Sequence, residues 1–63
     1  MINKNDEIFD IVEKYPQAEN IFRSYDAIAD CCILCTHLFD TIDLLSKKYN
    51  INIDILLKQL NSL

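Results

Sequence analysis

The sequence predicts an all-α fold, a compact orthogonal bundle of four to five short helices in one domain covering residues 1–63. Three observations predict it. Apolar residues recur at the i, i+3, i+4, i+7 spacing of one helix face. No stretch alternates strictly enough between apolar and polar residues for a strand. Helices of two to three turns are not stable alone in water, so each must bury its apolar face against the others.

The first helix is expected from about Asp6 to Tyr15, with Asn5 or Asp6 as the capping residue. Pro16 ends it, because proline disfavours the α conformation in the residue before it. Its apolar face has four residues at helical spacing: Ile8, Ile11, Val12 and Tyr15.

A second helix of about two turns is expected after Pro16, which is a favourable first residue for a helix. Its apolar face again has four residues: Ala18, Ile21, Phe22 and Tyr25. Residues 26–30 have weak periodicity and are predicted to be a connector. The cysteine segment that follows, residues 31–39, is compatible with a short helix or a tight loop.

Two further helices complete the bundle. Thr41 is the predicted N-cap of the third, and Asn50 follows its end at a position that often adopts a left-handed conformation. Asn52 or Asp54 is expected to cap the last helix. The two apolar faces are Ile42, Leu45, Ser46 and Tyr49, then Ile53, Leu56, Leu57 and Leu60.

The chain has no glycine, although average usage predicts roughly four at this length. Dinucleotide fingerprints, P-loops and EF-hand loops require glycine at fixed positions, so all three are excluded. A chain of 63 residues also has too small a core for a large substrate cleft. A binding, redox or interaction module is therefore favoured over an enzyme with a full catalytic apparatus.

The net charge is −4, and no run of basic residues is longer than Lys47-Lys48. Nucleic acid is therefore a poor partner. The longest apolar run, Cys31 to Cys35, is far too short to span a membrane, and the N-terminus has no signal-peptide core. We expect a cytoplasmic protein with no membrane partner. Clustered cysteines in a reducing compartment more often bind metal or carry redox chemistry than form structural disulfides.

Three interpretations of the cysteine cluster stay open. Cys31, Cys32 and Cys35 are candidates for thiol redox chemistry, in which one thiol attacks and a neighbour resolves. Cys32, Cys35 and His37 alternatively provide three soft ligands for zinc or an iron–sulfur cluster, although no second ligand pair follows. The third interpretation is that the cysteines are inert, buried apolar residues. Because their number is odd, at least one thiol stays outside any intramolecular disulfide.

The order of features also resembles a known family. The features are Tyr15-Pro16, Ile21-Phe22, the cysteines, Thr41-Ile42-Asp43, Ile53-Asp54 and Leu60-Asn61. This order resembles the hybrid-cluster-protein-associated disulfide domain, a small helical family with a C-x-x-C motif. It is also similar to the N-terminal domain of the iron–sulfur cluster repair di-iron proteins, which has a Cys-Cys pair. The resemblance implies an accessory role beside hybrid-cluster or iron–sulfur proteins, and no established reaction.

The chain departs from both families around its cysteines. Ile33-Leu34 stands where the repair-protein domain has two glycines, and Asp26, Ala27 or Ala29 stands where a glycine usually precedes the cysteines. We therefore expect Asp26 and Asn50, or a strained alanine, to occupy turns that relatives build with glycine.

The remaining features are expected to be structural. Asp10 and Glu13 are expected on a solvated face, and His37 taken alone is expected to be partly exposed. The leucine-rich C-terminus is a candidate homodimer contact, through Leu56, Leu57, Leu60 and Leu63. The aromatic residues are expected mainly in the core: Phe9, Tyr15, Phe22, Tyr25, Phe39 and Tyr49.

Overall fold

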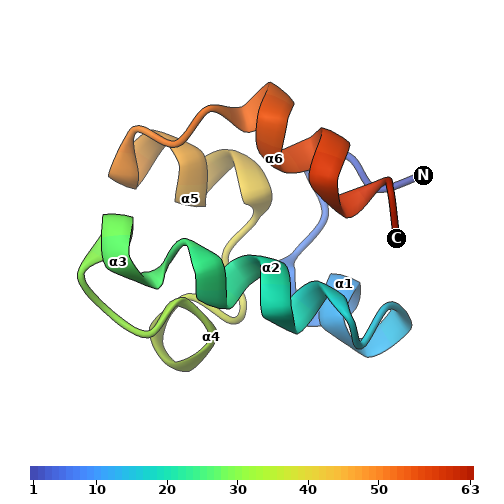
Figure 1. The fold of residues 1–63 in the computed structure, drawn as a ribbon, viewed down its shortest axis with the longest axis horizontal. Coiled ribbons are helices and arrows are strands. Elements are labelled where there is room, and N and C mark those ends of the chain that lie inside the picture. Colours follow the sequence, from blue (N-terminus) through green and yellow to red (C-terminus); the bar gives the residue numbers. More distant parts are fainter.

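Six helices and no strand make up the computed structural model, which describes all of residues 1–63 (Figure 1). The predicted all-α bundle is thereby confirmed. The helices are α1 (Ile8–Lys14), α2 (Ala18–Ser24), α3 (Asp26–Ala29), α4 (Ile33–Thr36), α5 (Ile42–Tyr49) and α6 (Ile53–Leu60).

Helix α2 lies at the centre of the bundle and packs against α1, α3, α4 and α6, while α5 packs against α6 (Figure 1). Phe22 on α2 is fully buried and is the largest side chain in the core. Every helix contributes at least one buried apolar residue to the same cluster, so the two single-turn helices are anchored as well. The cluster consists of Ile2, Ile8, Ile11, Ala18, Phe22, Ala29, Ile33, Ile42, Leu45, Ile51, Leu56 and Leu60.

Two sets of hydrogen bonds close the bundle at its ends. The Asn61 side chain accepts from the Ile2 amide at 2.8 Å and donates to the Ile2 carbonyl at 2.9 Å, which joins the two termini. An isolated antiparallel bridge pairs Glu7 with Thr41. This bridge holds the loop after α4 against the start of α1.

The predictions for the last two helices are confirmed. The Thr41 hydroxyl accepts from the Leu44 amide, and the Asn52 side chain accepts from the Ile55 amide, so both act as N-caps. Asn50 adopts the left-handed conformation, with φ 53°.

The prediction for the start of the first helix is wrong by two residues. Helix α1 begins at Ile8, and its N-cap, Glu7, makes no side-chain capping bond. The Ile8 amide instead donates to the Asp40 carbonyl at 3.0 Å. A backbone contact between residues distant in sequence therefore replaces the predicted local cap. The bridge between Glu7 and Thr41 brings the Asp40 carbonyl next to the start of α1.

Two predictions between α2 and α4 are also wrong. Residues 26–29 form the single-turn helix α3 rather than an irregular connector, since the buried Ala29 anchors them to the core. The left-handed residue of this region is Asp30, with φ 56°, and not Asp26. Asp26 is helical, and its side chain has another role, described below.

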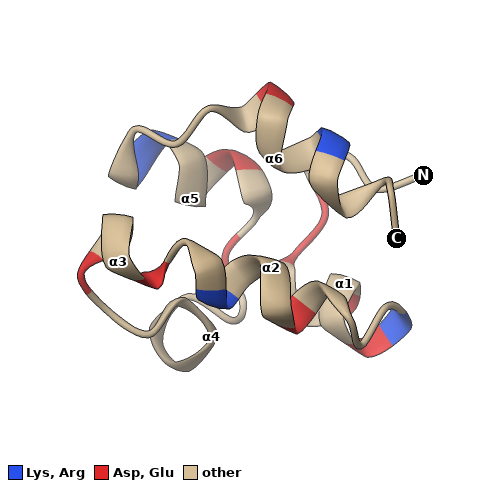
Figure 2. Cartoon of the chain, viewed as in Figure 1, with Lys and Arg blue, Asp and Glu red and all other residues tan.

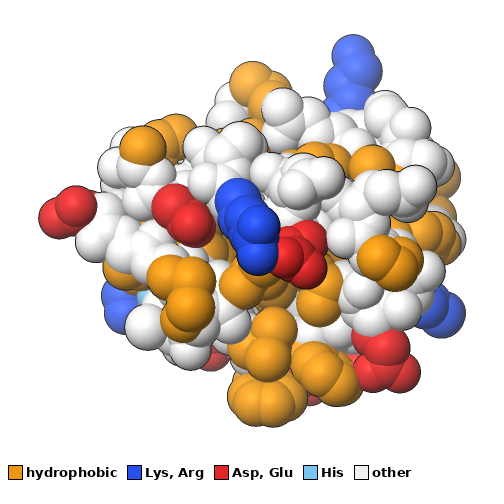
Figure 3. Space-filling view, turned by 60° about the horizontal axis from the view of Figure 1, so that its bottom comes forward, with side chains coloured by type: hydrophobic (Ala, Val, Ile, Leu, Met, Phe, Trp, Pro, Cys, Tyr) orange, Lys and Arg blue, Asp and Glu red, His pale blue; other side chains and the backbone are white.

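The aromatic residues are less buried than expected. Phe22 is buried and Tyr25 and Tyr49 are half-buried, whereas Phe9, Tyr15 and Phe39 are exposed. The rings of Phe9 and Phe39, the latter 71% exposed, lie 5.6 Å apart on the surface. In the space-filling view, hydrophobic side chains gather in a cluster on one face (Figure 3).

Basic residues are dispersed over the molecule (Figure 2). Lys14, Arg23, Lys47, Lys48 and Lys58 each lie in the last turn of a helix, where the helix dipole favours positive charge. None of the six helices has the length and apolar character needed to cross a membrane.

Candidate functional site

The cysteine segment is held in place by the turn between α3 and α4. Asp30 ends α3 in the left-handed conformation, and the Cys31 amide donates to the Asp26 carbonyl at 3.3 Å. The Asp26 carboxylate accepts from the Ile33 amide at 3.1 Å, so it occupies the first free donor of α4. The fully buried Ile33 then anchors α4 to the core.

Cys32 and Cys35 form a disulfide at the two ends of this single turn, with their Cα atoms 5.2 Å apart. Cys32 is the N-cap residue of α4, and its carbonyl accepts from the amides of Cys35 and Thr36. The turn therefore presets the two cysteines at bridging distance. Both cysteines are exposed, so the disulfide is open to attack from solvent.

Cys31 is the free cysteine, and it is half-buried between α4 and α5. Its Sγ atom lies 3.4 Å from the Tyr49 hydroxyl oxygen and 3.8 Å from the Thr36 hydroxyl oxygen. The free thiol thus contacts side chains on both helices, and Thr36 directly follows the disulfide cysteine Cys35.

His37 is buried, contrary to the expected partial exposure. Only 7% of the residue is exposed, and both ring nitrogens have partners. Nδ1 lies 2.7 Å from an Asp40 carboxylate oxygen and Nε2 lies 2.5 Å from the Tyr49 hydroxyl. The rings of His37 and Tyr49 meet edge to face at 5.3 Å. Since a buried imidazole requires hydrogen-bond partners, these contacts explain why His37 lies inside the bundle.

The three zinc ligands predicted from the sequence are not brought together in this oxidised form, in which two of them form a disulfide. Cys32 and Cys35 are joined to each other, and the nitrogens of His37 face Asp40 and Tyr49. No group of three His, Cys, Asp or Glu residues lies close enough to hold a metal ion. Because a cysteine binds zinc as the thiolate and not within a disulfide, metal binding here stays a prediction for the reduced protein.

The pKa of Tyr49 is raised above its ordinary value of 10.0. The side-chain hydrogen bond with Cys31 is the largest cause, followed by loss of hydration and then by the negative charges of Cys31 and Asp40. Lys48, whose ammonium nitrogen lies 5.8 Å from the centre of the Tyr49 ring, does not outweigh these effects. Tyr49 therefore stays a protonated phenol over the physiological range.

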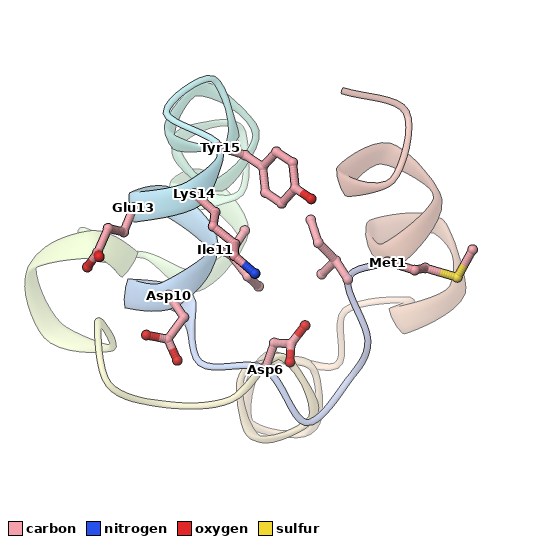
Figure 4. Close-up of a pocket in the computed structure, with 8 residues that line it drawn as sticks. Met1, Asp6, Asp10, Ile11, Glu13, Lys14 and Tyr15 are labelled. Carbon is pink, nitrogen blue, oxygen red and sulfur yellow. The ribbon is translucent and has the colours of Figure 1, made fainter.

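A separate pocket of about 290 Å³ lies between α1 and the N-terminal segment (Figure 4). Its lining combines the apolar Ile11 and Tyr15 with the carboxylates of Asp6, Asp10 and Glu13. None of its lining residues belongs to the cysteine segment, so it is not part of this site. Asp10 and Glu13 are exposed, as expected for a solvated face.

Three further side chains surround the cysteines and were not predicted from the sequence to belong to the site: Tyr49, Asp40 and Thr36. Tyr49 was expected only to pack in the core. The three-residue spacing of His37 and Asp40 was an available signal, because it brings side chains together across one turn. The Tyr49 contact had no local signal, since it depends on how α5 packs beside the loop.

Comparisons with protein-family models, with curated proteins and with solved structures gave no match. The resemblance to the hybrid-cluster-protein-associated disulfide domain thus stays a prediction from sequence.

Proposed function

We propose that this chain is a small thiol–disulfide exchange module in which Cys32 and Cys35 cycle between a disulfide and a dithiol. The observation that carries the proposal is the exposed disulfide closed across a single-turn helix. Exchange requires a thiolate to reach a disulfide sulfur, and exposure provides that access.

The exchange is balanced with a partner dithiol as the reductant. A partner thiolate attacks one sulfur of the Cys32–Cys35 bond, a mixed disulfide forms, and the other cysteine leaves as a thiolate that takes up a proton. The second partner thiolate then attacks the mixed disulfide and releases the first cysteine. The partner is oxidised to a disulfide, and Cys32 and Cys35 are reduced to thiols.

The charges near the disulfide indicate the chemistry of the partner. Helix α4 carries no charged residue, and Asp26 and Asp30 precede it (Figure 2). These acids disfavour a second anion, so we propose a partner whose reactive cysteines have basic neighbours. The sequence resemblance adds the proposal that this partner is a hybrid-cluster or iron–sulfur protein in the cytoplasm.

A non-catalytic protein-interaction domain is the second candidate function. The exposed pair Phe9 and Phe39 favours it, since such rings are more often buried in a monomer. The two functions are compatible, because an exchange module also needs a surface on which its partner docks.

Thiol counting combined with intact-mass measurement tests the exchange function. The oxidised chain should show one free thiol, and dithiothreitol should raise the count to three with a mass gain of two hydrogens. Removal of the reductant and addition of glutathione disulfide should reverse both changes. The Cys31→Ser variant should undergo the same cycle with zero and two thiols.

Two results would contradict the proposal. One is a bond that reacts with dithiothreitol only after denaturation. The other is a reduced protein whose Cys32 and Cys35 do not re-form a bond with each other in the presence of glutathione disulfide.

A further inference from the structure

Four side chains form a continuous hydrogen-bonded chain from the free thiol to a carboxylate. Cys31 contacts Tyr49, Tyr49 contacts His37, and His37 contacts Asp40, at 3.4, 2.5 and 2.7 Å. The chain joins three segments of the fold: the turn before α4, the end of α5 and the loop after α4.

The Asp40 carboxylate at one end sets the direction of these hydrogen bonds when His37 is neutral. The carboxylate accepts, so a neutral His37 carries its hydrogen on Nδ1 and presents Nε2 as an acceptor. The Tyr49 hydroxyl then donates to Nε2, and its oxygen accepts from the Cys31 thiol. In this arrangement the donors point from the sulfur toward His37, as in a base-activated nucleophile.

The burial of these groups suits proton transfer within the protein. The His37 side chain is 9% exposed, whereas the Asp40 side chain is 43% exposed and contacts solvent. The other charged groups near the chain are Lys48 over the Tyr49 ring, and Asp26 and Asp30 in the turn before Cys31. Asp26 is engaged by the Ile33 amide, so it does not compete for the proton.

We propose that Tyr49, His37 and Asp40 relay the proton of Cys31, and that Cys31 is an internal nucleophile which exchanges with the Cys32–Cys35 disulfide. The exchange part rests on the function proposed above. Thr36 places the free thiol beside the helix that carries the disulfide, because its hydroxyl lies 3.8 Å from the Cys31 sulfur and it follows Cys35 in α4.

The step involves no net oxidation. The thiol proton passes to the Tyr49 oxygen while the phenol proton passes to His37 Nε2, which leaves an imidazolium paired with Asp40. The Cys31 thiolate attacks the Cys35 sulfur, so the Cys31–Cys35 bond forms and the Cys32–Cys35 bond breaks. The electron pair leaves on Cys32, which takes a proton from solvent, and the imidazolium returns its extra proton to solvent, so no net charge is created.

The consequence is a change in which thiol the module presents. Before exchange the free thiol is half-buried beside α5, and afterwards it is the exposed Cys32. The relay thus controls whether Cys32 is available to a partner as part of a disulfide or as a reactive thiol.

Alkylation of the oxidised protein with iodoacetamide, without reductant, tests the proposal, with the labelled cysteine identified by peptide mass mapping. We expect label on both Cys31 and Cys32, with a distribution independent of protein concentration because the exchange is intramolecular. Label on Cys31 alone would overturn the exchange. The Cys31→Ser variant, which has no free thiol when oxidised, should take up no label.

The relay is tested by Tyr49→Phe, which keeps the ring and removes the hydroxyl. Alkylation near neutral pH should slow by about tenfold, and the rate profile should move toward alkaline pH, since a positioned base accelerates such reactions at least this much. Tyr25→Phe is the matched control, because Tyr25 is also half-buried but bonds Gln59 on α6 at 2.7 Å, and its rate should be unchanged. Unchanged rate and profile in Tyr49→Phe, with native helicity by circular dichroism, would overturn the relay.

Failure of this proposal and failure of the exchange function have different signatures. Redox cycling of Cys31→Ser reports the function of Cys32 and Cys35 alone. If that variant cycles while the wild type is labelled on Cys31 only, the internal exchange is wrong and the proposed function stands.

Discussion

The helix pair α5–α6 and residues 26–40, which include the cysteine segment, are held in place in different ways. The pair has two eight-residue helices, each with a side-chain N-cap and an apolar face that meets the core. Residues 26–40 contain two four-residue helices without a side-chain cap on the N-cap residue, held by the Asp26 carboxylate, a disulfide and the His37 contacts. Packing stabilises the first region, and specific polar and covalent contacts position the second.

In this very small protein the reactive cysteines thus lie in the region that depends least on core packing. A core of this size rarely supplies more than about 3–5 kcal/mol of stability. The segment that bears the reactive groups adds only a few residues to that core, chiefly Ala29 and Ile33. Its geometry is therefore sensitive to single polar contacts and to the redox state, whereas α5–α6 should be insensitive to both.

The largest effect is expected from cavity formation in the helix pair. Leu56 on α6 is fully buried, so Leu56→Ala should lower the free energy of unfolding by about 2–5 kcal/mol. Urea denaturation followed by circular dichroism measures this loss. Ile55→Ala is the matched control, because Ile55 is 53% exposed and should change stability by less than about 0.5 kcal/mol. Equal losses in the two variants would contradict the assigned packing.

Reduction of the Cys32–Cys35 bond should have the next largest effect. The bond closes a loop of only four residues, so chain entropy gives it about 2 kcal/mol. Urea denaturation with and without dithiothreitol measures the difference. Amide exchange should report increased opening at Cys35 and Thr36 and little change within α6. A uniform increase over the whole chain would contradict the independence of the two regions.

Removal of a single polar contact compares the two regions directly. Asp26→Ala and Asn52→Ala each remove a side-chain acceptor from a helix start and should each cost about 1 kcal/mol. Only Asp26→Ala should also alter the rate at which dithiothreitol reduces the disulfide, because it loosens the first turn of α4. Identical reduction rates in both variants would show that Asp26 does not position the cysteines.

The two left-handed residues give a smaller effect. Asp30 and Asn50 both have positive φ, which glycine adopts without strain. Asp30→Gly and Asn50→Gly should each change the unfolding free energy by at most about 1 kcal/mol, since relief of strain is opposed by greater freedom of the unfolded chain. A loss well above this value at Asp30 would indicate that its carboxylate has a structural role.

The smallest effect is the alkaline dependence of stability that comes from Tyr49. Its pKa is raised in the folded state, so its stabilising contribution is complete below the unfolded value of 10.0 and is lost as the pH rises through the folded value. The stability difference between wild type and Tyr49→Phe should be constant from about pH 8 to about pH 9 and fall above pH 10. A difference that does not change with pH would contradict the contact with Cys31.

The sequence predicted the regular part of the fold well and the site only in outline. Thr41, Asn50 and Asn52 act as their types suggest, because capping and left-handed turns are decided by neighbours in the chain. The start of α1 was wrong because its first donor bonds Asp40, which lies 32 positions away. Helix α3 was missed because it owes its existence to the burial of Ala29 and not to periodicity.

Dependence on tertiary contacts also limits how much of the site could be predicted from the sequence. The cysteine cluster was visible in the sequence as residues 31–35, and so was the fact that one thiol must stay unpaired. The burial of His37 and its hydrogen bond with Tyr49 could not be predicted, because they depend on the packing of α5 beside a loop. Residues that lie close through tertiary packing alone leave no mark in local spacing.

A redox titration tests the central claim most directly. The wild-type protein is equilibrated in a series of reduced and oxidised dithiothreitol mixtures, quenched with acid and separated by mass. We expect a reversible two-electron transition between a form with one thiol and a form with three, with Cys32 and Cys35 as the residues that change. A protein whose thiol count stays constant across the whole series would contradict it.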